Sequence, residues 1–389
     1  MADLKIGVVG FGNMGSAHAG GLARGLVEGA RLAALCDCAP ERLKLAAEIH
    51  PDVPRFEDYH ACLASDIDAV LVAVPHPMHG EIALAALAAG KHVLTEKPID
   101  VRVSKAQALC EAARRSDRVF GIMFNQRTNP IFQRAREIVR GGELGELKRS
   151  VWIITNWYRT QHYYDSGAWR ATWAGEGGGV LLNQAPHNLD LWQWICGMPT
   201  HVRATCDVAR YHRIEVEDEA TIMTRYANGA TGLFLTSTGD YPGTNRLEIS
   251  GDRGKLVMEE GKLKWWKLAS SEREVRFTSD ESMKKIPFTV EEYAPEDQGS
   301  AHLGILQNFV NAIRRGESLL APGVEGINEL TISNAAYLSS WTGEEIALPM
   351  DTALFDRLLD ERAAKSSYRE HAVADAPSGQ YSDRWQVKW

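Results

Sequence analysis

The chain has 389 residues, more than one compact core usually holds, and no low-complexity block divides it, so we expect two closely packed domains. The hydrophobic fraction of 44% and the charged fraction of 24% are those of an ordinary globular protein. A formal net charge of −8 argues against a nucleic-acid-binding surface and favours a small-molecule ligand.

The first residues and the cysteines bear on where the protein works. The chain opens with a short polar stretch that runs into an apolar strand, without the charged and apolar regions of a signal peptide. No apolar run approaches the roughly 20 residues that cross a bilayer, so we expect a cytoplasmic protein with no membrane partner. The six cysteines are scattered and form no CxxC pair, which favours reduced thiols over a disulfide framework or a zinc site.

Predicted strands and helices alternate through the first third of the chain. Continuous apolar runs, typical of strands buried on both faces, lie at 5–9, 31–36, 69–74, 91–95 and 119–124. Helices are predicted between them at 16–27, 41–49, 59–64, 79–89 and 104–116. The alternation predicts an α/β Rossmann fold with a doubly wound parallel sheet over residues 1–125.

A different pattern follows a predicted helix at about 130–141. Longer strands that look antiparallel are predicted at 146–158, 200–210, 218–227, 230–238, 244–250, 254–258 and 262–267. Two helices, near 300–315 and 323–342, should close this part. We therefore predict a second α+β domain over 126–348, built on a large, mainly antiparallel open sheet. In the C-terminal extension, 349–389, the polar stretch after residue 360 should be a frayed tail, although its two tryptophans within 380–389 leave open that it docks on a neighbouring subunit.

The sequence Gly10-Phe11-Gly12-Asn13-Met14-Gly15 lies between the first predicted strand and the next helix. A GxGxxG pattern alone is a weak signal. In this context the three glycines allow a tight turn, close approach of the backbone to a pyrophosphate, and close packing of helix on sheet. We therefore expect these six residues to bind a dinucleotide at the positive end of the helix.

Asp37 ends the second predicted strand, about 20 residues beyond the glycines. An acidic side chain there can accept hydrogen bonds from the adenosine ribose hydroxyls and would repel a 2′-phosphate. The sequence thus favours NAD over NADP, with Arg42 as the feature that speaks for NADP. The structural alternative for Asp37 is a helix or turn cap.

Several short motifs resemble one family. They begin with Val74-Pro75-His76-Pro77-Met78-His79 and with Glu96-Lys97-Pro98, which follows a Gly-Lys-His-Val strand. The others are Asn125-Gln126-Arg127, Trp169-Arg170, Gly177-Gly178-Gly179, His187-Asn188-Leu189-Asp190, Asn228-Gly229-Ala230 and the segment 308–313. Together they resemble the glucose-fructose oxidoreductase/inositol dehydrogenase (Gfo/Idh/MocA) family over nearly all of residues 4–348.

The resemblance implies an NAD-dependent oxidoreductase that transfers hydride between nicotinamide and a ring hydroxyl or ketone of a sugar, glycoside or cyclitol. It implies that Lys97 reaches the nicotinamide ribose and the reacting hydroxyl, and that Glu96 lies against the nicotinamide half of the cofactor. A lysine at the carboxyl end of a parallel strand also points into the crevice where such sheets bind ligands, whereas the alternative is a solvated loop lysine. Further cofactor contacts are expected from Pro75, His76, His79, Asn125, Arg127, Trp169 and Arg170.

His76 and His79 form an HxxH pair, which raises the question of a metal. No carboxylate or cysteine of suitable spacing follows, and the hydride chemistry of the family requires no metal. We therefore expect no metal site.

His187 is the candidate general base, because a histidine that titrates near neutrality can take the hydroxyl proton. It begins a predicted helix at 187–196, where Asp190 lies three residues on and could orient the ring or cap the helix. The alternative is a structural histidine. Many relatives carry aspartate where Asn183 stands, and an amide cannot accept a proton, so we expect Asn183 to bind substrate rather than to join a Lys-Asp-His relay.

The segment 157–170 is rich in aromatic and polar side chains and is the expected substrate wall. Aromatic rings stack on the apolar faces of sugars, and the polar groups bond to hydroxyls. The alternative is a subunit interface, and an anionic substrate group could also bind Arg159 or His162. The expected substrate contacts are Trp157, Tyr158, Arg159, His162 and Tyr163.

Two other functions remain open alongside the dehydrogenase. One is a glycoside hydrolase that retains NAD, oxidises a ring hydroxyl transiently and cleaves by elimination. The other is a non-catalytic NAD-binding regulator, which Lys97 and His187 argue against. A half-apolar sheet needs cover, so we also expect a homodimer or homotetramer.

Overall fold

The structure of the protein, a computed structural model, describes residues 2–297 and 299–367. Its first sheet has six parallel strands in the order β3-β2-β1-β4-β5-β6. This is the Rossmann order, and it confirms the predicted doubly wound sheet. The strands are β1 (Leu4–Val9), β2 (Ala30–Cys36), β3 (Arg55–Phe56), β4 (Ala69–Val72), β5 (His92–Thr95) and β6 (Phe120–Ile122).

Helices cover both faces of this sheet, which is why its central strands are apolar throughout. The first helix begins at Asn13 rather than at residue 16, because Gly12 already takes the capping position after the glycine turn. The helices of this region are α1 (Asn13–Ala23), α2 (Pro40–Ile49), α3 (Tyr59–Ala64), η1 (His76–Met78), α4 (His79–Ala88), α5 (Val103–Arg115) and η2 (Asn125–Thr128).

The second sheet has nine strands in the order β14-β13-β12-β11-β7-β10-β9-β8-β15. Only β7 and β10 pair in parallel, so the predicted large, mainly antiparallel sheet is confirmed. The strands are β7 (Leu147–Ile154), β8 (His201–Val208), β9 (Glu217–Arg225), β10 (Thr231–Ser237), β11 (Asn245–Gly251), β12 (Gly254–Glu259), β13 (Lys262–Leu268), β14 (Phe288–Tyr293) and β15 (Ile346–Ala347).

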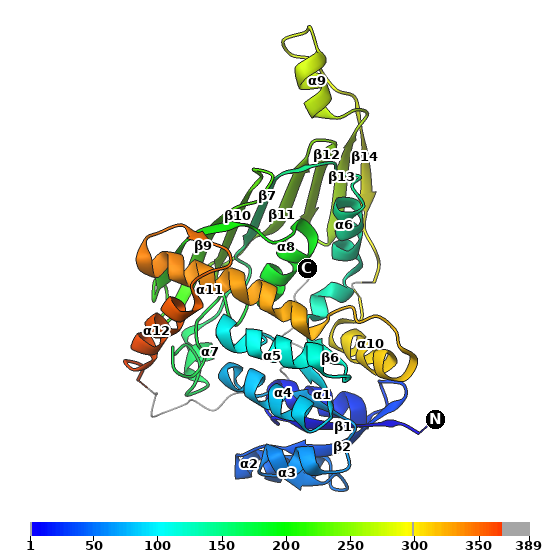
Figure 1. Ribbon diagram of the computed structural model, residues 1–389, viewed down its shortest axis with the longest axis vertical. Helices are drawn as coiled ribbons and strands as arrows, with labels where there is room; N and C mark the ends of the chain where they lie inside the picture. The colour runs from blue at the N-terminus through cyan, green and yellow to red at the C-terminus, as the bar shows by residue number, and fades with distance from the viewer. Residues whose placement is uncertain (1, 298, 368–389) are drawn as a thin grey trace.

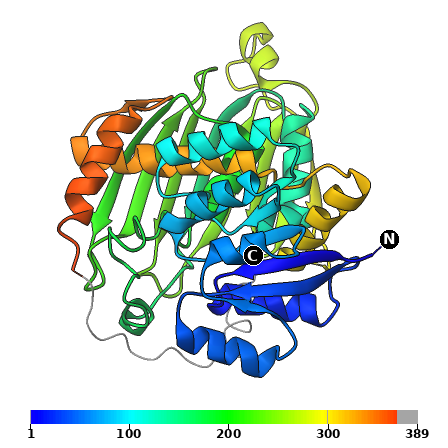
Figure 2. The same cartoon turned by 60° about the horizontal axis from the view of Figure 1, so that its bottom comes forward.

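The inner face of the second sheet packs on α6 (Pro130–Arg140), α8 (Pro186–Cys196) and α11 (Gly326–Thr342). Figures 1 and 2 show α11 crossing the strands, with α5 of the first domain on its other side. Trp152, Phe234 and Trp265 fill this inner layer. Residues of alternate register point the other way, and among them Met223 is 50% exposed. The sheet is therefore buried on one face only within a single chain.

One helix lies in a different place from that expected. The helix α10 (Ala301–Arg315) packs against β5 and η2 of the first domain, not against the second sheet. The following segment stays there, because Ile122 N–H donates to the Ala321 carbonyl at 3.1 Å. The chain therefore returns to the first domain before η3 (Gly323–Glu325) leads into α11.

Three helices were not expected: α7 (Gln161–Asp165), α9 (Glu272–Thr278) and α12 (Thr352–Ala363). The last lies in the C-terminal extension, mostly before residue 360, after which a frayed tail was predicted. It begins at a cap in which Asp351 Oδ1 accepts from Leu354 N–H at 2.9 Å, and Phe355 and Leu359 are buried. The aromatic stretch 380–389 lies outside the described residues. None of the described helices is both long and apolar enough for a membrane span.

Candidate active site

A cavity of about 460 Å³ lies where the carboxyl ends of the first sheet meet the turn that precedes α8. Such an edge is where ligands bind to open α/β sheets. The first domain contributes Gly10, Gly12, Asn13, Met14, Asp37, Pro75, His76, His79, Glu96, Lys97 and Asn125 to its lining. The second part of the chain contributes Trp157, Tyr163, Trp169, Arg170, Asn183, Gln184, His187 and His302.

The three glycines of the turn have different surroundings. Gly10 has a φ of +93°, and a Cβ there would lie 2.3 Å from the Ala73 carbonyl oxygen. A Cβ on Gly15 would lie 1.7 Å from the Gly10 carbonyl oxygen, because the helix packs tightly on the turn. Around Gly12, by contrast, a Cβ would meet no atom within 4 Å. The backbone at Gly12 therefore faces open cavity, as a bound pyrophosphate requires.

Two members of the motif do not line the cavity: Gly15, which lies beneath it, and Phe11, whose ring is buried. The Phe11 main chain still shapes the site, because its N–H donates to Asp37 Oδ2 at 2.7 Å. Asp37 Oδ1 accepts from Ala39 N–H at 2.9 Å. Asp37 is thus a turn cap, yet it also lines the cavity beside Arg42, with carboxylate lone pairs left for ribose hydroxyls.

Glu96 and Lys97 lie at the end of β5, at the other end of the cavity. Glu96 is buried and its Oε1 lies 2.8 Å from His18 Nε2. Burial alone would raise the pKa of this carboxyl, but the His18 hydrogen bond and the charges of His18, His302 and Lys97 lower the pKa to about 2. Glu96 is therefore an anion beside the Lys97 ammonium.

Lys97 reaches across to the second part of the chain. Its Nζ donates to the main-chain carbonyl of Asn183 at 2.7 Å. Burial lowers the pKa of Lys97, while the carboxyl groups of Glu96, Glu329 and Glu176 oppose that effect. Burial raises the pKa of Glu176 and, strongly, that of Glu329, so Glu96 is the strongest acid among them. The ammonium is therefore held by a neutral acceptor, the Asn183 carbonyl, with the Glu96 carboxylate adjacent in sequence.

His187 lies in the first turn of α8, directly after Pro186, which is favoured at a helix start. It is 9% exposed, and its Nδ1 has no hydrogen-bond partner among the described residues. Burial, followed by the nearby charges of Lys97 and His302, holds the pKa of His187 well below its ordinary value. The ring is therefore neutral at pH 7 and able to accept a proton.

Arg127 and Asp190 do not take the places expected for them. Asp190 does not orient His187, because its two oxygens accept from Arg127 Nη2 at 2.6 Å and Arg127 Nε at 2.8 Å. Arg127 in turn does not line the cavity; it is fully buried and also pairs with Glu325 at 2.5 Å. This ion pair ties α8 to η2, and so fixes the helix that carries His187.

The aromatic wall is only partly turned to the cavity. Trp157 and Tyr163 line it, whereas Tyr158, Arg159 and His162 do not. Tyr158 is 43% exposed and its ring lies 5.4 Å from that of Tyr241. The Arg159 guanidinium lies over the Tyr163 ring at 5.0 Å. We therefore correct the expected substrate contacts: Tyr158, Arg159 and His162 lie outside the cavity lining.

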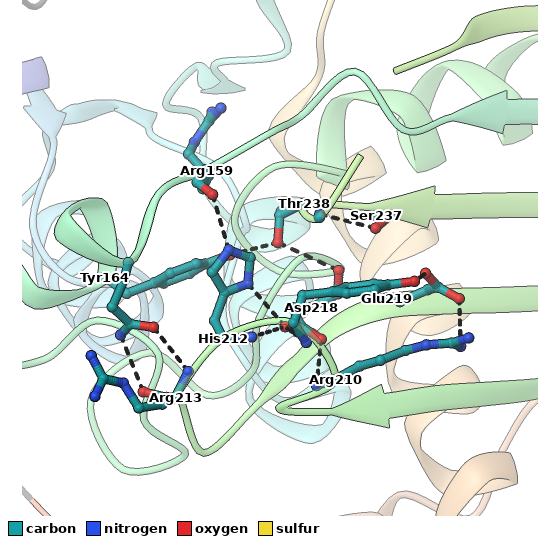
Figure 3. A network of polar contacts seen from close by, with 12 residues as sticks. Arg159, Tyr164, Arg210, His212, Arg213, Asp218, Glu219, Ser237 and Thr238 are labelled. Carbon is teal, nitrogen blue, oxygen red and sulfur yellow. Dashed lines mark hydrogen bonds and ion pairs between the residues drawn. The ribbon is translucent and has the colours of Figure 1, made fainter. Parts of the chain in front are cut away.

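A polar network fastens this wall to the second sheet (Figure 3). The His212 ring lies between Asp218 Oδ2 and the Arg159 carbonyl, 2.9 Å from each. The Tyr164 hydroxyl lies 2.8 Å from Thr238 Oγ1. Because Asp218 is the second residue of β9 and Thr238 follows β10, the wall is held by the ends of two adjacent strands.

Asn183 lines the cavity, but protein groups occupy much of its amide. Its Nδ2 donates to Glu176 Oε1, and its Oδ1 accepts from the Tyr163 hydroxyl at 3.3 Å. Glu176, Gln184, His18 and His302 belong to the site and were not expected there. Gln184 adjoins Asn183 in sequence, whereas nothing in the pattern around His302 links it to a turn more than 100 residues away.

The HxxH pair is engaged with main-chain groups. The two ring nitrogens of His79 lie 2.7 Å from the Pro98 carbonyl and 2.8 Å from the Val74 carbonyl. His76 Nδ1 lies 3.3 Å from the Glu176 carbonyl. Within the described residues no three His, Cys, Asp or Glu side chains are grouped as a metal site would need.

Comparison with known proteins agrees with this geometry. Residues 4–124 match the sequence model of the oxidoreductase family with an NAD-binding Rossmann fold, GFO/IDH/MocA, and residues 132–257 match the GFO/IDH/MocA C-terminal domain. The myo-inositol 2-dehydrogenase of Thermotoga maritima is 25% identical over 339 residues, 86% of this chain and 95% of the relative. The levoglucosan dehydrogenase of Pseudarthrobacter phenanthrenivorans is 26% identical over 329 residues, 73% of this chain and 79% of the relative.

A solved structure gives the same result in three dimensions. The WlbA dehydrogenase of Bordetella pertussis, in complex with NADH and UDP-GlcNAcA, has a TM-score of 0.75 and 25% identity to this chain. The match covers 90% of this chain and 100% of that one.

Proposed function

The chain is a member of the Gfo/Idh/MocA family of NAD-dependent oxidoreductases, and we propose that it interconverts a ring hydroxyl and the corresponding ketone of a sugar, glycoside or cyclitol. The observation that carries the proposal is the presence of Lys97 and His187 in one cavity with the glycine turn. The named dehydrogenases among its relatives act on inositol and levoglucosan, which supports the substrate class.

The cofactor would lie along the cavity from the turn to Lys97. The open backbone at Gly12 and Asn13 would hold the pyrophosphate, Asp37 the adenosine ribose, and Glu96 the nicotinamide end. NAD, when bound, supplies the carbon that accepts the hydride. The match to an NAD-binding family and the NADH in the WlbA complex support NAD rather than NADP.

The protein side chains would handle the hydroxyl proton. Neutral His187 would accept it, and the Lys97 ammonium would bond to the reacting oxygen and stabilise its negative charge as the hydride leaves. Trp157, Tyr163 and Trp169 would present aromatic faces to the sugar ring and exclude water. In the reverse direction His187 would return the proton to the ketone oxygen.

A substrate panel tests this function. Sugars, glycosides and cyclitols would be incubated with the protein and NAD, and both NADH and released aglycone would be measured. Accumulation of NADH in proportion to substrate is the expected result. Aglycone release with catalytic NAD and no net NADH would instead identify the redox-neutral hydrolase, and no reaction on a broad panel would count against the proposed substrate class.

We also propose that two or four copies associate through the outer face of the second sheet. Met223 is half-exposed there, and Val151 and Leu235 are only partly buried, so a partner would cover apolar surface. Light scattering should show a dimer or tetramer at micromolar concentration, and Met223→Glu should weaken this association.

The six unpaired cysteines support the cytoplasm as the location of the protein.

A further inference from the structure

The turn between Ala171 and α8 holds a carboxyl group that the proposed reaction does not use. Glu176 is 2% exposed and does not line the cavity. Its Oε2 accepts from Ala171 N–H at 2.6 Å, and its Oε1 accepts from Asn183 Nδ2. Burying a carboxyl group is unfavourable unless it is hydrogen-bonded, so these two donors stabilise Glu176 in its buried position.

Glu176 lies directly behind the group that holds the Lys97 ammonium. Lys97 Nζ bonds to the main-chain carbonyl of Asn183, and Glu176 bonds to the side chain of the same residue. The main-chain carbonyl of Glu176 also lies 3.3 Å from His76 Nδ1. A shift of Glu176 would therefore move Asn183, and with it the acceptor that aims Lys97.

Glu176 is also one of the charges that act on Lys97. The groups around Lys97 come from every element that packs on it. They are Glu96 after β5, Glu329 on α11, Glu176 and Arg170 in the turn region, His76, His79, His187 and His302. Burial lowers the pKa of Lys97, and Glu176 is one of the three carboxyl groups that act in the opposite direction. Burial raises the pKa of Glu176 itself, and the charges of Arg170 and Lys97 with the hydrogen bonds from Ala171 and Asn183 oppose that rise.

We propose that Glu176 is a positioning residue for the reaction, which acts through Asn183 to aim the Lys97 ammonium and to preserve its charge. The proposal rests on the proposed function in that Lys97 acts on the substrate. It assigns to the Glu176–Asn183 pair a single negative charge, which the Glu176 carboxyl group carries and the Asn183 amide stabilises by one hydrogen bond. The negative charge should therefore have the same effect on Lys97 whether residue 176 or residue 183 carries it.

A charge transfer between the two residues tests this. Glu176→Gln removes the charge and nearly preserves the shape. In the double variant Glu176→Gln/Asn183→Asp, the amide stands at position 176 and the carboxylate at position 183. The amide N–H donates to the carboxylate, and the amide oxygen accepts from Ala171 N–H. Both hydrogen bonds of position 176 are therefore kept, while the negative charge moves from position 176 to position 183. Asn183→Asp alone places two carboxyl groups in contact, which cannot both ionise.

We expect Glu176→Gln to lower kcat by up to about 10²-fold through misplacement of Lys97. The basic limb of the pH profile of kcat, where the ammonium loses its proton, should move to lower pH. The double variant should recover most of the loss in kcat and return the limb toward its original position. If both variants fold and bind NAD, an unchanged profile in Glu176→Gln, or no recovery in the double variant, would overturn the proposal.

Glu217→Gln is the matched control. Glu217 is likewise a fully buried carboxyl that holds the same turn, through Gly179 N–H and Leu181 N–H at 2.9 Å each, but it is not among the charges acting on Lys97. Its removal should lower thermal stability without moving the basic limb. If Glu176→Gln does not fold, the double variant is compared directly with the unaltered protein, and a displaced limb counts against the proposal.

A second measurement separates this inference from the proposed function. The rate of Lys97 acetylation as a function of pH, followed by mass spectrometry, reports the titration of its amine without any substrate. If the unaltered protein converts no substrate of the sugar panel, the proposed function fails. The acetylation profiles still show whether a carboxylate at position 183 can replace that of Glu176 in its effect on the Lys97 amine. Identical profiles in all variants would refute the role of Glu176.

Discussion

The two ends of the cavity are built by different means. At the glycine turn the protein presents main chain: Gly12 faces open space, and Asp37 braces the turn through Phe11 N–H. At the other end it presents titratable side chains in one region, with Glu96 and His187 buried and Lys97 and His302 partly buried. The first end binds by shape and dipoles, whereas the second depends on which groups carry protons. Substitutions at the glycine turn should therefore affect folding or cofactor binding, whereas substitutions at the other end should affect the chemical step.

The largest effect is expected at the titratable end. Lys97→Ala or His187→Ala should lower kcat by a factor on the order of 10² to 10⁴, because proton transfer and stabilisation of the reacting oxygen are lost. NAD affinity, measured by calorimetry, should change little, because the glycine turn is intact. Near-normal turnover in both variants would remove the basis for the assigned roles.

At the glycine turn, substitutions of two nearby glycines should have different effects, one on folding and the other on NAD binding. Gly15→Ala places a Cβ 1.7 Å from the Gly10 carbonyl oxygen, so thermal unfolding should show a loss of several kcal/mol or no folded protein. Gly12→Ala meets no protein atom within 4 Å, so the apo protein should keep its Tm while NAD binding weakens by about tenfold or more. Equal effects of the two variants on the apo Tm would contradict this division.

A smaller effect is expected at Asp37. Asp37→Ser removes the carboxylate that would bind the ribose hydroxyls and repel a 2′-phosphate, so the preference for NAD over NADP should narrow. Titrations of both cofactors against the unaltered and altered proteins measure it. Tighter binding of NADP by the unaltered protein would show that Arg42 dominates at this position.

The smallest effect is a pH dependence of stability from Glu217, which supports the turn at the titratable end. Burial raises the pKa of Glu217 to about 7. Since the folded state then holds the proton more tightly than the unfolded state, the stability from this group is present at acidic pH and is lost as pH rises toward about 7. Urea unfolding at several pH values should show a flatter profile in Glu217→Gln, and an unchanged slope would exclude this contribution.

The same contrast explains what the sequence could predict. The glycine turn is contiguous, and the alternation around it requires a parallel sheet, so both were accessible from local pattern. Arg127 and Asp190 are 63 residues apart, and only packing of η2 against α8 shows that they bind each other instead of cofactor and His187. Glu176 lies among glycines with no sequence signal of burial. The helix α12 was missed although Asp351 and the apolar side chains from Leu354 to Leu359 follow a helical pattern.

The return of α10 to the first domain has a consequence for protein engineering. Its buried Ile305, Leu306 and Phe309 lie on the side that meets the Rossmann sheet, and Gln307 bonds to the Glu28 main chain. A fragment cut near residue 125 would leave this surface bare and prone to aggregation. An isolated NAD-binding domain would instead need residues 300–322 joined to the fragment through a designed linker. Such a domain would combine two separate segments of the chain, which a simple truncation cannot give.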